Sequence, residues 1–484
     1  MMMEKVIPNT ALHDSPSAPR QQLVVAIVYV AVMFMAVLDT TIVNVALPTI
    51  ARDYHVGPSS VGMVSIAYLV SLTVFIPASG WWGDYIGGRR ALLVAVGIFT
   101  VASGLCGLAL SLDELVIFRI LQGIGGAVMT PVGLAMLFRV YPPNERVRIS
   151  SILAVFTALA PALGPILGGL FTSYLSWRLV FFVNLPIGVI VFGFAVTALA
   201  DHTPAHPGRL DVISLALSGS GLGSTMYGIS EGPVRGWSSC SILVAIIVGL
   251  GLLGAMVIVE LRSSSPLLDL RLFRNRLFAA TTAIYGLGSA AYLGALFLAA
   301  LFFQEALHFS AVKSGFITLP SALGVMVGGQ IVTRMLYPRT GPRRIAAAGL
   351  LAVSAMMFML AQVRVDESSW RLGLAMFGLG LGISFAFISA QAASMATITK
   401  AQTGRASSLF NASKQFGGAI GIAILSTIVA VEHSVQRSTG SINLDLCAYR
   451  HGFIAVAVAA LAGAVVAITI RDGDAASTMI SRRH

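Results

Sequence analysis

Residues 23–49 read LVVAIVYVAVMFMAVLDTTIVNVALPT, a run with a single charged side chain, Asp39. A helix needs about 20 mostly apolar residues to cross a bilayer, because it pairs its own backbone groups and each unpaired group in hydrocarbon costs several kcal/mol. The run is too long for the core of a signal peptide, and no small-residue cleavage site follows it. It therefore predicts a retained membrane-spanning helix.

The composition extends this prediction to the whole chain. Of its 484 residues, 56% are hydrophobic and only 11% are charged, against roughly 25% charged residues in an average soluble domain. The 20 acidic and 31 basic side chains cannot cover the two or three soluble domains that this length would form. An ordinary soluble protein is excluded. Three cysteines do not make a disulfide framework.

Fourteen segments are apolar enough to span a membrane, and the gaps between them are too short to hold a folded domain. We expect an all-α polytopic membrane protein with spans near residues 23–49, 60–80, 91–110, 114–137, 149–172, 179–199, 210–230, 240–260, 277–303, 313–336, 345–362, 370–396, 406–431 and 449–470. An even number of spans places both chain ends on one side of the membrane.

The basic residues indicate which side that is. If both ends are cytoplasmic, cytoplasmic segments carry 21 of the 31 lysines and arginines and the opposite side carries eight, with Arg119 and Lys414 inside spans. Cytoplasmic loops are enriched in Lys and Arg, so we expect a multi-pass protein of the inner or plasma membrane with cytoplasmic termini. The net charge of +11 then reflects orientation rather than nucleic-acid binding.

Two loops have similar sequences and indicate an internal repeat. GWWGDYIGGRRALL (residues 80–93) follows the second span and MLYPRTGPRRIAAAG (residues 335–349) follows the tenth. Parallel six-helix repeats around a midplane cavity are a known transporter plan, although any cytoplasmic loop can collect glycine and arginine. The predicted organisation is an N-terminal tail (1–22), an N-terminal six-helix bundle (23–199), two inserted helices with linkers (200–276), a C-terminal six-helix bundle (277–470) and a C-terminal tail (471–484).

Polar side chains in the first and fourth spans form the main candidate site. Asp39 is the only carboxylate well inside a span, where a charge costs roughly 2.5–3.5 kcal/mol and usually faces the interior for a functional reason. Arg119 and Gln122 share one face of the fourth span. We predict that Asp39 carries a proton and that Arg119 and Gln122 modulate it. The alternatives are a permanent structural pair with Arg119, or an Arg119 that extends to the nearer interface.

Glycines and loop charges supply candidate moving parts. Gly164 and Gly168 are spaced so that two helix backbones can touch, and the neighbouring proline favours bending. Asp84 could pair with nearby arginines or cap a neighbouring helix as two bundles rock, or it could be a solvated loop charge. The predicted latch and pivot residues are Asp84, Arg89, Arg90, Gly164, Pro165, Gly168, Gly169, Arg343 and Arg344.

A second set of polar and aromatic residues could line a substrate cavity. Lys414, on the thirteenth span, is either a cavity charge or a lysine that extends to the cytoplasmic surface. Aromatic residues in membrane helices serve more often in packing or as interface anchors. The predicted lining residues are Thr41, Asn44, Tyr68, Tyr285, Tyr292, Phe385, Gln391, Asn411 and Lys414.

The sequence shows no metal-ligand cluster, no phosphate-binding glycine loop and no nucleophile–base pair. We therefore expect no enzyme activity and no cofactor, with the proton as the coupling ion. The expected partners are a small amphiphilic substrate, the proton and membrane lipid, and no nucleic acid. A periplasmic adaptor and the oligomeric state are left open.

Several motifs together resemble those of the major facilitator superfamily, and within it the fourteen-helix drug:proton antiporters of the EmrB/QacA type. LDTTIVNVALPTIA (residues 38–51) and WRLVFFVNLPIG (residues 177–188) are similar to signatures of that subfamily. The other matching residues fall in the loop motif (Gly80, Asp84, Gly87, Arg89, Arg90), the fourth-helix proton-transfer motif (Arg119, Gln122, Gly123) and the fifth-helix antiporter motif (Gly164, Pro165, Gly168, Gly169). Tyr85 and Gly88 depart from the loop motif, where basic residues are usual.

The resemblance implies two six-helix bundles plus two inserted helices, and a proton-coupled exporter of drugs or other amphiphilic small molecules that works by alternating access. The charges inside spans favour neutral, monocationic or anionic substrates over dications. An exporter of one endogenous metabolite or lipid is the main alternative. The fifth-helix motif argues against an uptake symporter, and the short loops argue against a membrane enzyme or receptor.

Overall fold

The computed structural model describes residues 18–56, 58–200, 211–263, 269–309, 311–363, 368–399, 402–439 and 445–479. Every regular element in these ranges is a helix. The first part of the chain forms α1 (Ala18–Asp53), α2 (Pro58–Tyr85), α3 (Gly88–Leu108), α4 (Leu112–Val140), η1 (Pro143–Glu145), α5 (Arg146–Tyr174), α6 (Leu179–Phe182), α7 (Asn184–Ala198), α8 (Val212–Arg235) and α9 (Cys240–Arg262).

The rest of the chain continues in the same way. It forms η2 (Leu270–Arg274), α10 (Arg276–Leu301), η3 (Phe302–Ala306), α11 (Ala311–Thr318), α12 (Pro320–Ile331), η4 (Val332–Leu336), α13 (Tyr337–Leu360), α14 (Ser369–Ser394), α15 (Thr403–Thr439), α16 (Asp445–Ile468) and η7 (Asp472–Thr478).

Eleven helical stretches in the described ranges are long and apolar enough to cross a membrane. One of them, residues 313–360, contains both the tenth and the eleventh predicted spans, because the helical chain continues from one to the other through a kink at Gly341. The fifth and seventh predicted spans lie on α5 and α8, which are helical but are not among the eleven. The all-helical, multi-pass architecture is confirmed, and the count of fourteen spans stays a prediction.

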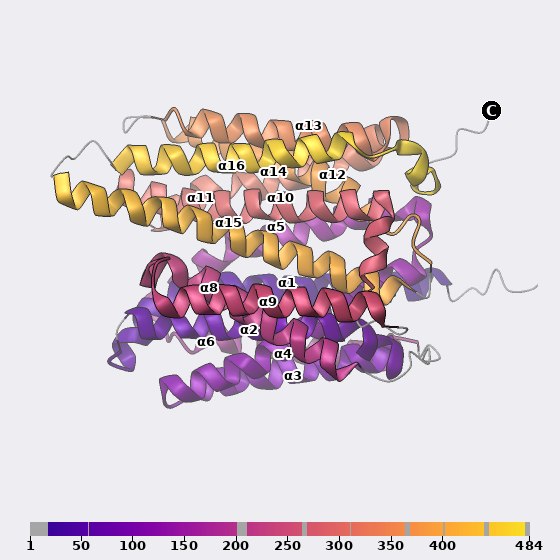
Figure 1. Ribbon diagram of the computed structural model, residues 1–484, viewed down its shortest axis with the longest axis horizontal. Helices are drawn as coiled ribbons and strands as arrows, with labels where there is room; N and C mark the ends of the chain where they lie inside the picture. Colours follow the sequence, from indigo (N-terminus) through magenta and orange to yellow (C-terminus); the bar gives the residue numbers. More distant parts are fainter. Residues whose placement is uncertain are drawn as a thin grey trace, which may run out of the picture.

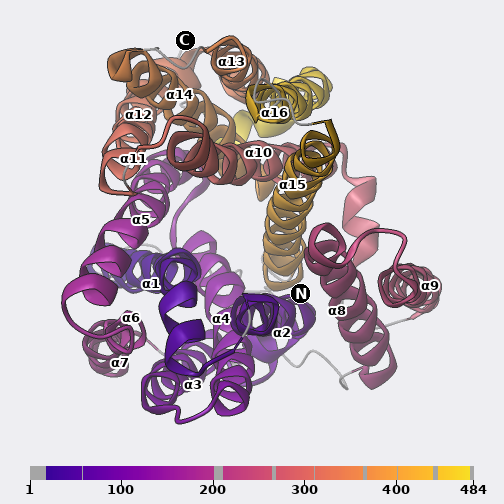
Figure 2. The ribbon, with the colours of Figure 1, turned by 90° about the vertical axis from the view of Figure 1, so that its left-hand side faces the viewer.

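The long helices run side by side along one direction (Figure 1). Viewed down that direction, α1 to α4 gather on one side and α10, α13, α14 and α16 on the other (Figure 2). Two helices join these groups: α5 packs on α1 and reaches α12 and α14, while α15 packs on α10 and reaches α2 and α4. The two groups therefore meet along two seams, one at α5 and one at α15.

The pair α8 and α9 lies outside this arrangement, beside the α15 seam (Figure 2). Helix α8 packs on α9, on α2 and on α15, and the Trp237 indole in the turn between them donates a hydrogen bond to Thr427 of α15 at 2.7 Å. The predicted inserted helices thus cover one of the two seams.

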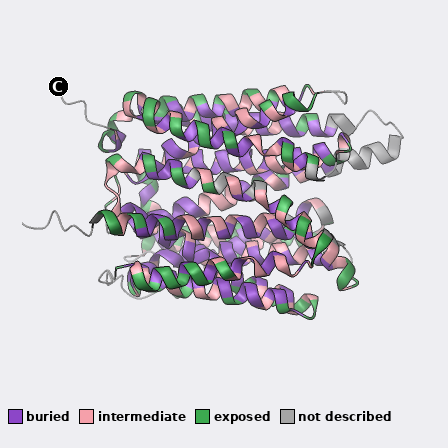
Figure 3. Ribbon diagram, turned by 180° about the vertical axis from the view of Figure 1, so that it is seen from behind, coloured by how far each residue is buried: buried purple, intermediate pink, exposed green. Residues whose placement is uncertain are grey.

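Exposed residues recur along the helices (Figure 3), and many of them are large and hydrophobic. On α9, Ile247 is 68% exposed and Leu250 is 56% exposed. Soluble proteins rarely expose contiguous apolar patches larger than a few hundred Å², so these faces are suited to contact with lipid. The buried faces, by contrast, form a continuous core that runs through both helix groups.

The two similar loops have the same backbone feature. Gly87 and Gly341 both have a positive φ, of 87° and 73°, and each lies two residues before an arginine pair. Glycine adopts this conformation without the steric cost that a side chain would carry. The acid near each loop differs in origin. Asp84 lies in the last turn of α2, just before its loop, whereas Asp472, from η7, accepts a hydrogen bond from the Arg343 backbone at 2.9 Å.

Candidate functional site

Asp39 lies in the middle of α1 with no exposed surface. Its carboxylate accepts hydrogen bonds from Arg119 Nη1 at 2.5 Å, Gln122 Nε2 at 2.9 Å and Asn184 Nδ2 at 3.1 Å. The structure therefore brings the three predicted proton-coupling residues together and adds a fourth side chain. A buried charge is tolerated only when it is paired and hydrogen-bonded in this way.

Arg119, on α4, is 1% exposed and makes contacts on all sides. It donates hydrogen bonds to Gln122 Oε1 at 2.7 Å and to the Val64 carbonyl at 3.2 Å, and the Tyr68 ring lies 4.2 Å from its guanidinium carbon. The guanidinium thus stays within the helix bundle. It does not extend to the nearer interface, which was one of the alternatives that the sequence left open. Arginine remains charged in proteins, so this site keeps a fixed positive charge beside the carboxylate.

Asn184 and Ser103 complete the site, and sequence reasoning did not select them. Asn184 is the first residue of α7 and is fully buried; besides Asp39, its amide donates to Ser103 Oγ at 3.2 Å. Ser103 also accepts from Gln122 Nε2 at 3.1 Å. The signal in the sequence is a polar amide inside the apolar stretch WRLVFFVNLPIG, residues 177–188.

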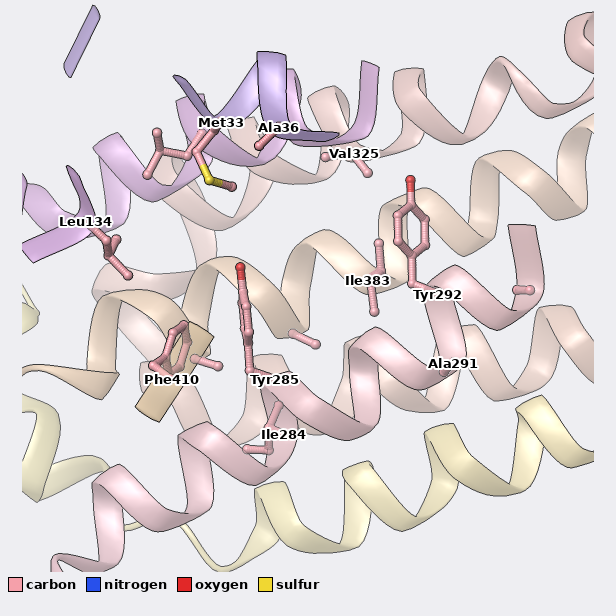
Figure 4. Close-up of a cluster of buried hydrophobic side chains, with 14 of the residues drawn as sticks. Met33, Ala36, Leu134, Ile284, Tyr285, Ala291, Tyr292, Val325, Ile383 and Phe410 are labelled. Carbon is pink, nitrogen blue, oxygen red and sulfur yellow. The ribbon is translucent and has the colours of Figure 1, made fainter. Parts of the chain in front are cut away.

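A cavity of about 1190 Å³, part of it open to solvent, lies between the two helix groups. Figure 4 shows Tyr285 and Tyr292 on α10, with both hydroxyls directed away from that helix toward Met33, Ala36 and Val325. The predicted cavity residues that line it are Thr41, Tyr285, Tyr292, Gln391, Asn411 and Lys414.

The other three predicted cavity residues are not among the described lining residues. Tyr68 faces the Arg119 guanidinium instead, where its ring stabilises a buried cation. Asn44 is exposed and accepts a hydrogen bond from Ser65 at 2.8 Å, and Phe385 packs beside a separate cluster that contains Tyr337. These three residues therefore differ from the expectation, because their side chains contact other parts of the protein and are not among the described lining residues of the cavity.

Helix α1 separates the Asp39 site from the cavity. Met33, Ala36, Val37, Thr40 and Thr41 line the cavity, whereas Asp39, within the same two turns, faces Arg119 on α4 and Asn184 on α7. A helix places residues three or four apart on one face, so a single rod presents its substrate-facing side chains and its carboxylate to opposite neighbours. A shift of α1 would therefore change both the contacts of Asp39 and the shape of the cavity.

The predicted latch has a different partner from the expected arginine pair. Asp84 accepts a hydrogen bond from Arg139 of α4 at 2.7 Å, while Arg89 donates to the Val196 carbonyl at 2.6 Å and Arg90, Arg343 and Arg344 have exposed side chains. At the same end of the molecule, Ser79 and Ser408 form a hydrogen bond of 3.0 Å between α2 and α15. The two helix groups are thus in direct contact at the end that holds Asp84.

The predicted pivot glycines differ in their surroundings. A Cβ atom on Gly164 would lie 3.1 Å from the Ile42 backbone nitrogen, and one on Gly168 would lie 3.0 Å from the Ile42 carbonyl oxygen. Gly169 has nothing within 4 Å of that position, and the side chain of Pro165 lies outside the described residues. On α15, Gly417 and Gly421 approach the backbone of α10 in a similar way. Close packing therefore joins α5 to α1 and α15 to α10.

Comparison with known proteins shows the family of this chain. Residues 29–422 match the Major Facilitator Superfamily. The chain is 33% identical to the "Multidrug resistance protein B homolog" of Mycobacterium tuberculosis over 82% of this chain and 74% of that protein. It is 29% identical to the "Putative multidrug resistance protein MdtD" of Klebsiella pneumoniae over 97% of this chain and 99% of that protein.

A third relative and a solved structure extend the comparison. The "Tetracenomycin C resistance and export protein" of Streptomyces glaucescens is 29% identical over 87% of this chain and 80% of that protein. The fold resembles the crystal structure of the human organic anion transporter MFSD10, with a TM-score of 0.64 and 15% identity over 94% of this chain and 100% of that one. The chain is a membrane transporter that belongs to the major facilitator superfamily.

Proposed function

We propose that this protein is a proton-coupled exporter of drugs or other amphiphilic small molecules, and that it works by alternating access. The observation that carries the proposal is the position of Asp39 on α1, on the side opposite to the residues that line the cavity. Protonation and substrate binding then act on the same helix. The names of the relatives in Mycobacterium tuberculosis, Klebsiella pneumoniae and Streptomyces glaucescens support export.

The coupling step follows from the hydrogen bonds of Asp39. When the carboxylate is ionised, Arg119, Gln122 and Asn184 hold it and thereby hold α1 against α4 and α7. A proton on Asp39 cancels its charge and weakens the attraction to Arg119. Helix α1 is then free to move with its cavity face, and loss of the proton on the other side of the membrane restores the original contacts.

The orientation that we propose places the Asp84 end in the cytoplasm, because the basic residues are concentrated on that side. With the Asp84 end closed by the Ser79–Ser408 contact, the described conformation fits a stage after substrate has left the cytoplasm. A proton entering the cell contributes roughly 2.3 kcal/mol per 100 mV of membrane potential, in addition to any pH gradient. This is the driving force that we assign to export.

A second candidate is an exporter dedicated to one endogenous compound, which the name of the Streptomyces relative favours. Its cavity would have the same construction but a narrow substrate range. A panel of neutral, anionic, monocationic and dicationic fluorescent amphiphiles separates the two candidates, because a multidrug exporter moves several members and a dedicated exporter moves one or none.

The test uses the purified protein in proteoliposomes and in detergent. Inside-out liposomes acidified in their lumen should accumulate at least one panel compound, and substrate added to the detergent-solubilised protein should release protons. Asp39→Asn should abolish both signals, while Asp53→Asn, at the exposed end of α1, should retain them. Proton release that is unchanged in Asp39→Asn would overturn the assignment of Asp39, and accumulation only in the opposite orientation would indicate uptake.

A further inference from the structure

Lys414 differs from every other residue of the cavity wall. Among the described residues that line the cavity, it is the single charged side chain. It comes from α15, and no hydrogen bond or ion pair joins it to another residue in the part of the chain that the structure describes. An ammonium group in a largely apolar space is unfavourable unless an anion or water accompanies it.

The carboxylate of Asp39 does not supply that anion. It lies on the face of α1 that is opposite to the cavity, and its charge is already balanced by Arg119 at 2.5 Å. The cavity wall contains no aspartate or glutamate among its described residues. The net charge that a molecule in this cavity meets is therefore positive.

The neighbouring side chains specify more than charge. Tyr285 lies with its ring centre 4.5 Å from that of Phe387 and 4.3 Å from that of Phe410, with the ring planes tilted by 38° and 33°. Of this aromatic cluster, Tyr285 and Phe387 line the cavity. Ser289, one turn from Tyr285 on α10, also lines the cavity; its hydroxyl is buried and has no hydrogen-bond partner in the described part of the protein. Buried polar groups are normally paired, so this hydroxyl indicates a ligand that carries hydrogen-bonding atoms.

We propose that Lys414 is the substrate-binding residue that selects charge, and that the favoured substrates are aromatic molecules carrying one negative charge, such as a carboxylate or phenolate. The ring packs against the cluster of Tyr285 and Phe387, the anion pairs with the Lys414 ammonium, and a second polar atom forms a hydrogen bond with Ser289. This inference rests on the proposed function, since it names the substrate class of the same cavity.

The proposal has an electrical consequence. Export of a monoanion in exchange for one incoming proton moves two elementary charges per cycle in the direction that a negative-inside potential favours, whereas a neutral substrate moves one. The transport rate of an anionic substrate should therefore depend more steeply on membrane potential than that of its neutral analogue.

The experiment measures binding to the full-length protein in detergent, using two fluorescent probes of the same ring system: anthracene-2-sulfonate, a permanent monoanion, and anthracene-2-carboxamide, which is neutral. The wild type should bind the sulfonate about tenfold more tightly, as one charge-assisted hydrogen bond predicts. Lys414→Met, which keeps the length of the side chain, should erase that preference while the Kd for the carboxamide stays within about twofold. Lys414→Arg should keep the preference.

The outcomes separate this inference from the proposed function. A sulfonate preference that persists in Lys414→Met, or a wild type that prefers the neutral probe, would overturn the anion site. Loss of proton release in Lys414→Met with the preference intact would show that Lys414 carries protons instead. If Asp39→Asn keeps the sulfonate preference but neither it nor the wild type shows proton-driven accumulation, the proposed function fails and the anion site stands.

Discussion

The Asp39 site and the Lys414 position show two different ways to keep a charge inside a membrane protein. Asp39 is held by Arg119, Gln122 and Asn184 on the side of α1 opposite to the residues that line the cavity. Lys414 faces the cavity without a partner in the described residues. In the first arrangement both charges of the pair belong to the protein. In the second, the charge is positioned to pair with a molecule that enters the cavity.

The contrast predicts opposite effects on stability. Removing one member of a buried pair leaves the other uncompensated, so it destabilises the fold. Removing a half-buried charge that has no partner among the described residues relieves its desolvation, so it should stabilise the fold.

Asp39→Leu removes the carboxylate that pairs with Arg119. It should lower the free energy of unfolding by about 3–5 kcal/mol because the Arg119 charge is left uncompensated. Arg119→Leu should have a similar cost, whereas the double variant should lose less than the sum of the two, by about 2 kcal/mol or more. Denaturant unfolding in detergent, followed by tryptophan fluorescence, gives these values.

The matched control for this cycle is the exposed pair at the end of α1. Asp53 and Arg178 lie 3.2 Å apart, with Asp53 46% exposed, and such pairs contribute about 0–1 kcal/mol. The hydrogen bond from Trp177, with further help from Arg178, holds the pKa of Asp53 below its usual range. Additive losses at Asp39 and Arg119 would contradict the paired-site interpretation.

Gly164→Leu tests whether α1, which carries the paired carboxylate, depends on its close contact with α5. The new side chain would collide with Thr41 and the Ile42 backbone, and overpacking of this kind costs about 1–3 kcal/mol. We expect reduced stability together with reduced transport. Gly169→Leu, where nothing lies within 4 Å of the added Cβ atom, is the control and should retain stability and transport. Equal losses in the two variants would show that the close contact between Gly164 and α1 is not what matters.

Lys414→Met removes the ammonium group in the cavity. It should raise the free energy of unfolding by about 1 kcal/mol, because this group no longer has to be desolvated. Lys414→Arg keeps the charge and should show no gain. The same unfolding assay serves, without ligand. A Lys414→Met protein that is less stable than the wild type would mean that the ammonium has a stabilising partner, and the contrast with Asp39 would fail.

Much of the fold could be predicted from the sequence, because segments of about 20 apolar residues have few alternatives to a membrane helix. The grouping of Asp39, Arg119 and Gln122 was predictable for a related reason: polar groups in apolar helices must find one another. Asn184 was not found, because its contact with Asp39 spans 145 positions of sequence and depends on where α7 begins.

The contacts of individual side chains limited the prediction of the cavity. Tyr68 and Tyr285 are both tyrosines in apolar helices, yet one lies against Arg119 and the other lines the cavity. Aromatic side chains fit a core, a lipid face or a cavity wall equally well, so composition does not distinguish the three. Asp84 shows the same limit, since its partner Arg139 arrives from the far end of α4 rather than from the adjacent arginine pair.

The position of α8 and α9 has a consequence for molecules that are already dissolved in the bilayer. On the α15 side, α8 packs over α2 and α15 and its turn is tied to Thr427, so sideways passage would require two helices to be displaced. On the α5 side, α5 meets α12 and α14 with no comparable helical pair over them among the described helices. A molecule dissolved in the lipid would therefore meet fewer covering helices on the α5 side of the transporter than on the α15 side.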